Sequence, residues 1–405
     1  MSAEQPDPPP RRRAGYLEFP VHHVRGGTST GLVISERWAP HDRALREELL
    51  RHLMGLPLDG VRAGNKQITG LGRIVPTGNK VFFARLDNTV SGPRIISTFA
   101  QLAADKAAVD WSVNCGNMSA ALPMWVLDTA QLPMAHPGTS FAIDIFNTNT
   151  GVTMGSRMRI AGDGRFVTAE IPGVDGAFPG VDLFLADPVG AKTGRLLPTG
   201  RAVDDIAGYA VSCVDVAVPM VIARAADFGK TAHEPVEALE ADRALMATLR
   251  DVWVEAGLRM ALKGPGGGPM TAAELAQSET IPKVCIVGPP GGTGNIAVRY
   301  FTPQSAHRSM AVSGGCCLAA AALIPGSVAH EFARNLPACG AAFTEMDVGI
   351  ENPAGVLEAT IDARLGPSGL EVRGAAYRRN TQVLLRGQVP LYRASAALRD
   401  AIPMA

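Results

Sequence analysis

Several common marks of protein class are missing from this sequence. Its 38 basic and 38 acidic residues cancel, so no overall charge favours binding to nucleic acid or to a membrane surface. No stretch reaches the roughly 18 charge-poor apolar residues that a membrane-spanning helix needs. The six cysteines include no CxxC pair, which argues against a disulfide framework and a zinc site. These absences predict a cytoplasmic protein that binds neither nucleic acid nor membrane and holds no metal.

Length and composition indicate how the chain is divided. A chain of 405 residues suits two domains, and its 44 glycines and 30 prolines predict tight turns and short strands. Residues 1–15 contain three prolines and three arginines in a row but no apolar segment, which predicts a disordered tail and no signal peptide. We expect a first domain at residues 16–203 and a second at 204–376. For the C-terminal segment, residues 377–405, a return to the first domain is left open.

Residues 113–122 read Val-Asn-Cys-Gly-Asn-Met-Ser-Ala-Ala-Leu, a polar start followed by the apolar run of a buried helix. The first backbone N–H groups of a helix have no partner within it, and the helix dipole there favours negative charge. This position would stabilise a thiolate at Cys115, and the neighbouring N–H groups would attract a carboxylate. The alternative is that Cys115 is a small buried apolar residue, as most free cysteines are.

Residues 25–31, Arg-Gly-Gly-Thr-Ser-Thr-Gly, lie between two predicted strands at 16–24 and 32–35. Glycines let the backbone approach a ligand closely, and Arg25 could pair with a carboxylate. The same residues match the hydrolase pattern G-x-S-x-G around Ser29. That pattern needs a helix after the serine, whereas β-favouring Leu-Val-Ile follows, so the hydrolase interpretation is disfavoured.

Hydrophobic periodicity predicts further elements in the first half of the chain. Leucines recur at helical spacing over residues 43–54, beside charged neighbours. Residues 79–84 are predicted as a strand that begins near Lys80, for which an ordinary exposed lysine is the alternative. Residues 99–109 are predicted as a helix that leads to Cys115. From 140 to 189, short alternating segments broken by turn residues predict antiparallel strands.

The second half begins with a strand-rich region near Tyr209. The further predictions are strands at 211–223, 282–287, 296–301 and 378–389, and helices at 234–257 and after Ser313. Residues 292–297 match the dinucleotide fingerprint G-x-G-x-x-A, which requires a helix after the glycines. Because the residues that follow favour a strand, we predict a hairpin there. Adjacent His22 and His23 would point to opposite faces of a strand, so they do not favour a shared metal.

Two features recur in the same order. Residues 79–83 (Asn-Lys-Val-Phe-Phe) resemble 282–286 (Pro-Lys-Val-Cys-Ile), and 115–122 align with 313–320. Each half therefore contains a strand led by a lysine and, later, a polar start to an apolar helix. Two such halves facing each other would bring two helix starts to one cleft, an arrangement that suits a polyanion.

These motifs together resemble the 2-methylaconitate cis–trans isomerase and 4-oxalomesaconate tautomerase family, relatives of diaminopimelate epimerase. The resemblance covers nearly the whole chain from about residue 16. It implies an α+β fold of two similar diaminopimelate epimerase-like domains. Each would be a curved, barrel-like sheet around a central apolar helix, with the active site in the cleft between them. The motifs that carry it lie at residues 25–29, 80–81, 114–117, 197–200, 282–284 and 307–326.

The resemblance implies that Lys80 and Cys115 are the acid/base pair. In diaminopimelate epimerases a second cysteine stands where Ser313 falls, and a serine there favours an isomerase over a two-thiol racemase. The family usually reads R-G-G-T-S-K-G, whereas this chain has Thr30 in place of the lysine, so one cationic contact is missing. The expected substrate-binding residues are Arg25, Thr28, Ser29, Gly116, Asn117, His307, Met310, Ser313, Gly314 and Gly315.

The implied reaction is a cofactor-free proton shift on an unsaturated di- or tricarboxylate such as aconitate, 2-methylaconitate or 4-oxalomesaconate. Removing a proton beside a conjugated carboxylate creates a dienolate, whose charge must be stabilised where it develops. Lys80 must give up its proton to act as a base, and Cys115 could return a proton; which of the two removes it is left open. The expected partner is a small polycarboxylate, and a homodimer is left open.

Two other functions stay open at this point. A non-catalytic carboxylate-binding protein would keep the cleft without the chemistry; Lys80 and Cys115 argue against this function, and Thr30 argues slightly for it. A serine hydrolase using Ser29 would need a histidine base directed at that hydroxyl.

Overall fold

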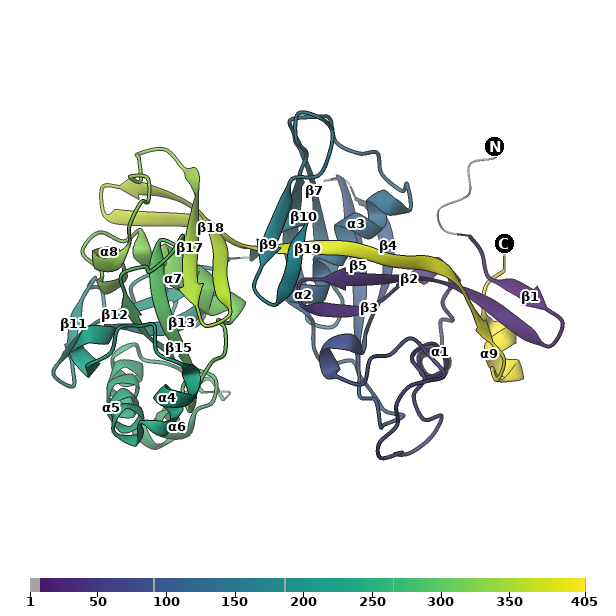
Figure 1. Cartoon of the computed structure of the whole chain (residues 1–405), viewed down its shortest axis with the longest axis horizontal. Coiled ribbons are helices and arrows are strands. Elements are labelled where there is room, and N and C mark those ends of the chain that lie inside the picture. The colour runs from purple at the N-terminus through teal and green to yellow at the C-terminus, as the bar shows by residue number, and fades with distance from the viewer. Residues whose placement is uncertain (1–7, 90–91, 186, 265, 405) are drawn as a thin grey trace. The chain divides into compact units, whose positions relative to one another are not determined.

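The computed structural model describes residues 8–89, 92–185, 187–264 and 266–404. They form a sheet-rich α+β fold that divides into two compact units (Figure 1). The first unit contains the chain up to Glu170, Val174–Leu183 and the residues from Arg379 onward; the second contains Ile171–Gly173 and Phe184–Arg378. The second unit thus begins before the boundary expected after residue 203. Whether the units are two epimerase-like domains with a cleft between them stays a prediction.

The first unit contains three strands that carry predicted site residues at or next to one end. Strand β2 (Tyr16–Gly26) pairs antiparallel with β3 (Ser29–Ser35), and β3 pairs parallel with β4 (Lys80–Thr89). Helix α1 (Arg43–Met54) connects β3 to β4 and has the range that its leucine spacing predicts. Asp42 caps its start by accepting from the Leu45 N–H at 2.9 Å.

The order of strand pairings in the first unit recurs in the second. The pairs β2–β3, β3–β4, β4–β5, β5–β7 and β7–β8 are antiparallel, parallel, antiparallel, parallel and antiparallel, and β12–β13, β13–β14, β14–β15, β15–β17 and β17–β18 repeat that series. Lys80 and Lys283 begin the corresponding strands β4 and β14. The order of strand pairings therefore recurs where the sequence features recur, and the similarity of the two units as domains stays a prediction. The strands are β5 (Gly92–Leu102), β7 (Ser140–Asn147), β8 (Val152–Arg159), β12 (Tyr209–Val216), β13 (Val218–Arg224), β14 (Lys283–Gly288), β15 (Ile296–Thr302), β17 (Thr344–Asn352) and β18 (Gly355–Gly366).

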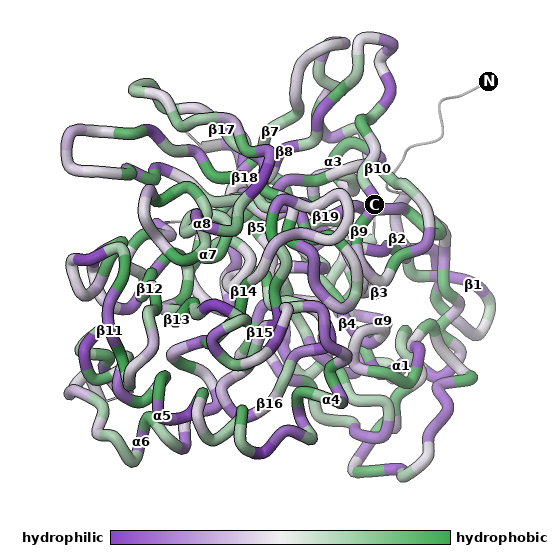
Figure 2. The backbone as a smooth tube through the Cα atoms, turned by 60° about the vertical axis from the view of Figure 1, so that its left-hand side comes forward, coloured by the Kyte–Doolittle hydropathy of each residue, from purple (hydrophilic) through white to green (hydrophobic). Residues whose placement is uncertain are grey.

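An apolar helix occupies the same place in each series. In the first unit α2 (Gly116–Ser119) and α3 (Ala121–Asp128) precede β7, and in the second α7 (Val312–Ala322) precedes β17. Helix α7 is buried from Gly314 onward and packs against β12, β13, β17 and β18. Its backbone is coloured as predominantly hydrophobic in Figure 2. A helix that is apolar on all sides needs such enclosure.

Strand β19 (Gly369–Leu391) begins in the second unit, where it pairs with β18. From Thr381 onward it pairs antiparallel with β2 in the first unit and runs beside it in Figure 1.

The remaining elements are β1 (Arg11–Arg13), β6 (Val109–Asp110), β9 (Thr168–Ile171), β10 (Val174–Leu185), β11 (Asp204–Ile206), β16 (Ser305–Ala306), α4 (Val236–Ala241), α5 (Arg243–Arg259), α6 (Ala272–Gln277), α8 (Val328–Phe332), α9 (Ala396–Ala401) and the short 3-10 turns η1 (Glu36–Trp38), η2 (Pro76–Gly78) and η3 (Ala225–Phe228). Of the helices in the described ranges, none has the length and apolar character to cross a membrane.

Three local predictions are wrong. Residues 99–102 belong to β5, not to a helix, because pairing with β4 overrides the helix preference of the alanines that follow. Part of the expected disordered tail is the strand β1, which pairs with β2 and places Arg13 3.0 Å from Glu18; residues 1–7 lie outside the described range. Helix α7 begins at Val312, so Ser313 lies in its first turn and not before it.

The glycines that match the dinucleotide fingerprint form a hairpin loop between β14 and β15, as predicted. Backbone N–H groups of Gly291, Gly292 and Gly294 donate to the carboxylate of Glu351 at 2.8, 2.7 and 2.9 Å. Burial acts to raise the pKa of Glu351, but these hydrogen bonds outweigh it and the pKa is lowered. The N–H groups of this loop therefore bind a carboxylate of the chain itself.

Candidate active site

Lys80 and Cys115 are in direct contact in the first unit. The Lys80 Nζ lies 3.1 Å from the Cys115 Sγ, and both side chains are half-buried. No carboxylate of the described residues lies within ion-pair distance of Lys80. An amine and a thiol at this distance can exchange a proton, and each can serve as the charged partner of the other.

The position of Cys115 follows from the start of helix α2. Cys115 has an extended backbone and caps the helix, and its Sγ accepts from the Met118 N–H at 3.4 Å. Its own N–H donates to the Asn114 Oδ1 at 2.7 Å, and the Ser119 hydroxyl donates to its carbonyl at 3.0 Å. The thiol is thus held at the end of the helix where unpaired N–H groups favour negative charge, as the sequence predicts.

Strand alternation explains why Lys80 meets this helix start. Gly31 is the register partner of both Val24 and Lys80, and Gly26 pairs with Ser29, so these residues share one face of the sheet. A Cβ at Gly26 would lie only 2.5 Å from the Asn117 carbonyl oxygen. Glycine at 26 therefore lets α2 approach the strand closely enough for its first residues to meet Lys80.

Ser29 lies on the same face but does not have the surroundings of a hydrolase nucleophile. Its hydroxyl is buried and 3.9 Å from the Cys115 Sγ. In the described part of the chain, no histidine is hydrogen-bonded to it. The strand β3, and not a helix, follows it. A Ser-His base arrangement is therefore missing from Ser29.

Arg25 points to the opposite face of β2 from Lys80 and Cys115. Its NH1 donates to the Gly27 carbonyl at 3.0 Å and to the Asn380 Oδ1 at 2.6 Å, and its guanidinium stacks 4.5 Å from the Phe178 ring centroid. Burial lowers the pKa of Arg25, and its NH2 has no hydrogen-bond partner among the described residues. The contact with a substrate carboxylate expected for Arg25 stays a prediction.

Arg379, which no sequence motif predicted as a site residue, lies on the face of the sheet that carries Cys115. The Arg379 Nε donates to the Asn117 Oδ1 at 2.7 Å, and the Asn117 Nδ2 donates to the Thr28 hydroxyl at 3.2 Å. Asn117 and Thr28 were expected at the site and are brought together here. A cationic Arg-Arg-Asn run inside the final predicted strand was the only sequence signal for Arg379.

The site residues expected in the second half of the chain belong to the second unit. The His307 Nδ1 accepts from the Ser309 N–H at 2.9 Å, and Met310 is buried. A Cβ at Gly314 or Gly315 would lie 2.6 Å from Tyr300 or Leu357, respectively, so these glycines allow close packing of α7. Ser313 is half-buried in the first turn. Substrate binding by these five residues stays a prediction.

His22 and His23 point to opposite faces of β2, as predicted. The His22 Nε2 lies 3.6 Å from the Asp128 Oδ2. His23 is buried on the other face, and its Nε2 has no hydrogen-bond partner among the described residues. Burial, with a smaller contribution from the charge of Arg73, lowers the pKa of His23 to about 4.

The lowered pKa of His23 predicts a loss of stability in acid. Unfolded histidine takes up a proton near pH 6.5, whereas folded His23 resists it until about pH 4. Between these values the unfolded state binds more protons, so stability falls as the pH falls, by about 1–3 kcal/mol from this residue. Chemical denaturation from pH 7 to 4 should show a smaller loss for His23→Gln than for the wild type. The exposed His136→Gln is the control, and an equal loss in all three proteins would contradict this account.

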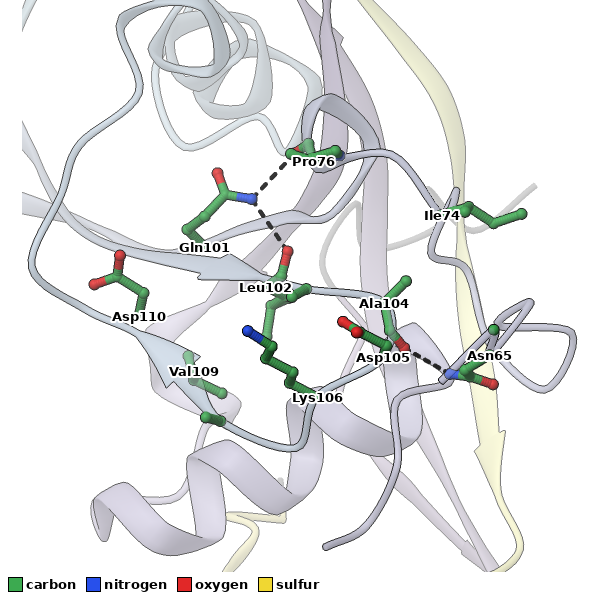
Figure 3. Close-up of a pocket in the computed structure, with 13 residues that line it drawn as sticks. Asn65, Ile74, Pro76, Gln101, Leu102, Ala104, Asp105, Lys106, Val109 and Asp110 are labelled. Carbon is green, nitrogen blue, oxygen red and sulfur yellow. Dashed lines mark hydrogen bonds between the residues drawn. The ribbon is translucent and has the colours of Figure 1, made fainter. Parts of the chain in front are cut away.

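A hollow of about 830 Å³ lies elsewhere in the first unit (Figure 3). Neither Lys80 nor Cys115 lines it. Gln101, the register partner of Lys80, reaches its wall and donates to the Pro76 carbonyl at 3.1 Å. The hollow therefore includes the cross-strand neighbour of Lys80 but neither member of the Lys80–Cys115 pair. Its lining residues are Gly64, Asn65, Ile74, Pro76, Gln101, Leu102, Ala103, Ala104, Asp105, Lys106, Ala108, Val109 and Asp110.

Known proteins resemble this chain over nearly its whole length. The 4-oxalomesaconate tautomerase of Pseudomonas putida is 31% identical over 382 residues, which cover 93% of this chain and 96% of that protein. The (4E)-oxalomesaconate Delta-isomerase of a Novosphingobium species is 32% identical over 387 residues, covering 94% and 99%. The crystal structure of a methylitaconate-delta-isomerase matches with a TM-score of 0.75 at 25% identity, covering 95% and 99%. The family model described as PrpF protein matches residues 16–392. These findings confirm the resemblance inferred from the motifs, and the chain belongs to the PrpF protein family.

Proposed function

We propose that the protein is an isomerase or tautomerase that moves a proton on an unsaturated di- or tricarboxylate. The observation that carries this proposal is the 3.1 Å contact between the Lys80 amine and the Cys115 thiol. The relatives named above, a 4-oxalomesaconate tautomerase and two Delta-isomerases, support the reaction class. Acids of the oxalomesaconate, methylitaconate and 2-methylaconitate type are the substrates to test.

The proposed chemistry needs one group to take a proton and another to give one back. When a proton leaves a carbon beside a conjugated carboxylate, the electron pair spreads into a dienolate; reprotonation at another carbon gives the isomer. Each proton transfer by a positioned side chain contributes about 10²–10⁴-fold in rate. Lys80 and Cys115 share this work, one of them neutral or anionic as the base and the other protonated as the acid.

Polar groups beside the pair would bind the carboxylates and stabilise the dienolate. In the first unit these are Thr28, Ser29, Asn117 and the N–H of Gly116. Arg25 stays a proposed partner for a substrate carboxylate, although its side chain lies on the other face of β2. We also propose that the residues expected in the second half of the chain bind substrate and that both units are epimerase-like domains. The residues concerned are His307, Met310, Ser313, Gly314 and Gly315.

Proton NMR with a panel of acids tests the proposed function. The panel contains cis- and trans-aconitate, 2-methylaconitate, 4-oxalomesaconate and methylitaconate, each incubated with the folded protein. We expect a new isomer of at least one acid, formed at a rate proportional to protein concentration. If no acid changes while shifts in its resonances show binding, the non-catalytic carboxylate-binding function replaces this proposal.

A further inference from the structure

Arg379 is a buried arginine, 8% exposed, that the proposed chemistry does not use. It lies on the face of the sheet that carries Lys80, because Thr381 pairs with Gly26 and Arg379 is two residues before it. Its Nε donates to the Asn117 Oδ1 at 2.7 Å. Asn117 lies two residues after Cys115, in the first turn of α2. Arg379 therefore contacts a side chain of the helix whose start is capped by Cys115.

The strand that carries Arg379 is firmly joined to β2 at this point. The Gly27 N–H donates to the Asn380 carbonyl at 2.9 Å, and the Thr381 hydroxyl donates to the Arg25 carbonyl at 2.8 Å. Both contacts lie within two residues of Arg379 along β19. The backbone that carries Arg379 is thus fixed to β2, which favours a defined position for its side chain.

The side-chain amide of Asn117 packs closely against Gly27 and Thr28. Gly27 has a left-handed backbone with φ of 53°, and a Cβ there would lie 2.7 Å from the Asn117 Oδ1 and 3.1 Å from the Arg379 Cδ. The Thr28 hydroxyl, at 3.2 Å from the Asn117 Nδ2, closes the other end of the amide. A shift of this amide would move the first turn of α2, and Cys115 caps that turn.

We propose that Arg379 is a positioning residue for Cys115. Through Asn117 it fixes the start of α2 and so keeps the Cys115 Sγ at 3.1 Å from the Lys80 Nζ. The effect of Arg379 on turnover rests on the proposed function, whereas its effect on the thiol does not. Displacement of a reacting group by about 1 Å can cost about 10²-fold in rate, so a support of this kind has a measurable effect.

A double-mutant cycle tests the proposal through turnover. Arg379→Gln should lower kcat by about 10–100-fold and change KM less than about threefold. Asn117→Ala should lower kcat by a similar factor and also raise KM, because Asn117 is itself a proposed carboxylate-binding residue. Because both act through one hydrogen bond, the double variant should be no slower than the worse single variant. Arg379→Lys, which keeps the charge but not the Nε donor, should also be slow. Additive losses in kcat in the double variant, or a rise in KM without a fall in kcat in Arg379→Gln, would mean that Arg379 binds a substrate carboxylate directly. Either result would overturn the proposal.

Alkylation of the thiol tests the same proposal without a substrate. The rate of iodoacetamide labelling at Cys115, read by peptide mass spectrometry, should fall about threefold or more in each single variant and no further in the double variant, because the thiolate is the reactive form and loses its amine partner. Cys339, also partly exposed, is the internal control. Arg386→Gln, an exposed change in the same strand, should leave both rates unchanged.

The two readouts separate failure of this inference from failure of the proposed function. If no acid is turned over, labelling of Cys115 alone decides the role of Arg379. If Arg379→Lys and Asn117→Ala, shown to be folded by their melting temperatures, label Cys115 at the wild-type rate, Arg379 does not position the thiol.

Discussion

Replacing Cys115 by serine should lower kcat by about 10³-fold while the protein stays folded. A serine hydroxyl fits the space of the thiol, but it is a much weaker acid, so it cannot exchange a proton with the Lys80 amine as a thiol can. The Sγ contacts that would be altered are those with the Lys80 Nζ at 3.1 Å and the Met118 N–H at 3.4 Å. The measurement is kcat and KM with the best acid of the panel.

Cys339→Ser is the matched control for this change. Cys339 is also a free, partly exposed cysteine, and it belongs to the second unit. The control should keep the wild-type kcat, and both variants should melt within a few degrees of the wild type. Wild-type turnover by Cys115→Ser would remove the thiol from the mechanism.

Replacing Lys80 by methionine should lower kcat by about 10²–10⁴-fold. Methionine keeps the length and apolar stem of the side chain, so its packing near the Phe99 ring, 5.7 Å from the Nζ, is largely preserved. What is lost is the amine that donates to Cys115 and exchanges the proton. Steady-state kinetics at several pH values would show the loss over the whole range and not only a displaced optimum.

Lys106→Met is the control for the lysine. Lys106 is exposed and lines the hollow of the first unit. It should keep the wild-type kcat. The labelling of Cys115 by iodoacetamide gives a second test, since loss of the Lys80 amine should slow it. A Lys80→Met protein with normal turnover and normal labelling would rule out the acid/base pair.

Much of the fold could be predicted from local sequence. Helix α1 follows its leucine spacing, and the two lysine-led strands and apolar helices mark the duplication that the strand pairings repeat. The Gly26–Gly27 pair indicates that some group approaches the backbone closely there, but it does not identify the group. That this group is the start of α2 depends on the pairing of β2 and β3 with β4.

The remaining features depend on contacts between distant residues. Arg379 reaches Asn117 over 262 positions of the chain, so no local pattern marks it. Arg25 was expected to bind a substrate carboxylate, and strand alternation places its side chain on the face of β2 opposite Lys80. A motif read as a string of residues does not show which face each side chain takes. Residues 99–102 were predicted as part of a helix. They form a strand because they pair with β4, and a local sequence pattern does not show pairing with residues that distant.

The most direct test of the central claim follows deuterium by NMR in D₂O. Wild type, Cys115→Ser and Lys80→Met are compared on the acid that is turned over best. If Lys80 and Cys115 move the proton, the wild type forms the isomer and introduces solvent deuterium at the carbon that is reprotonated, whereas both variants do so about 10²-fold more slowly or worse. Deuterium entry at the wild-type rate in either variant would contradict the assignment of that residue.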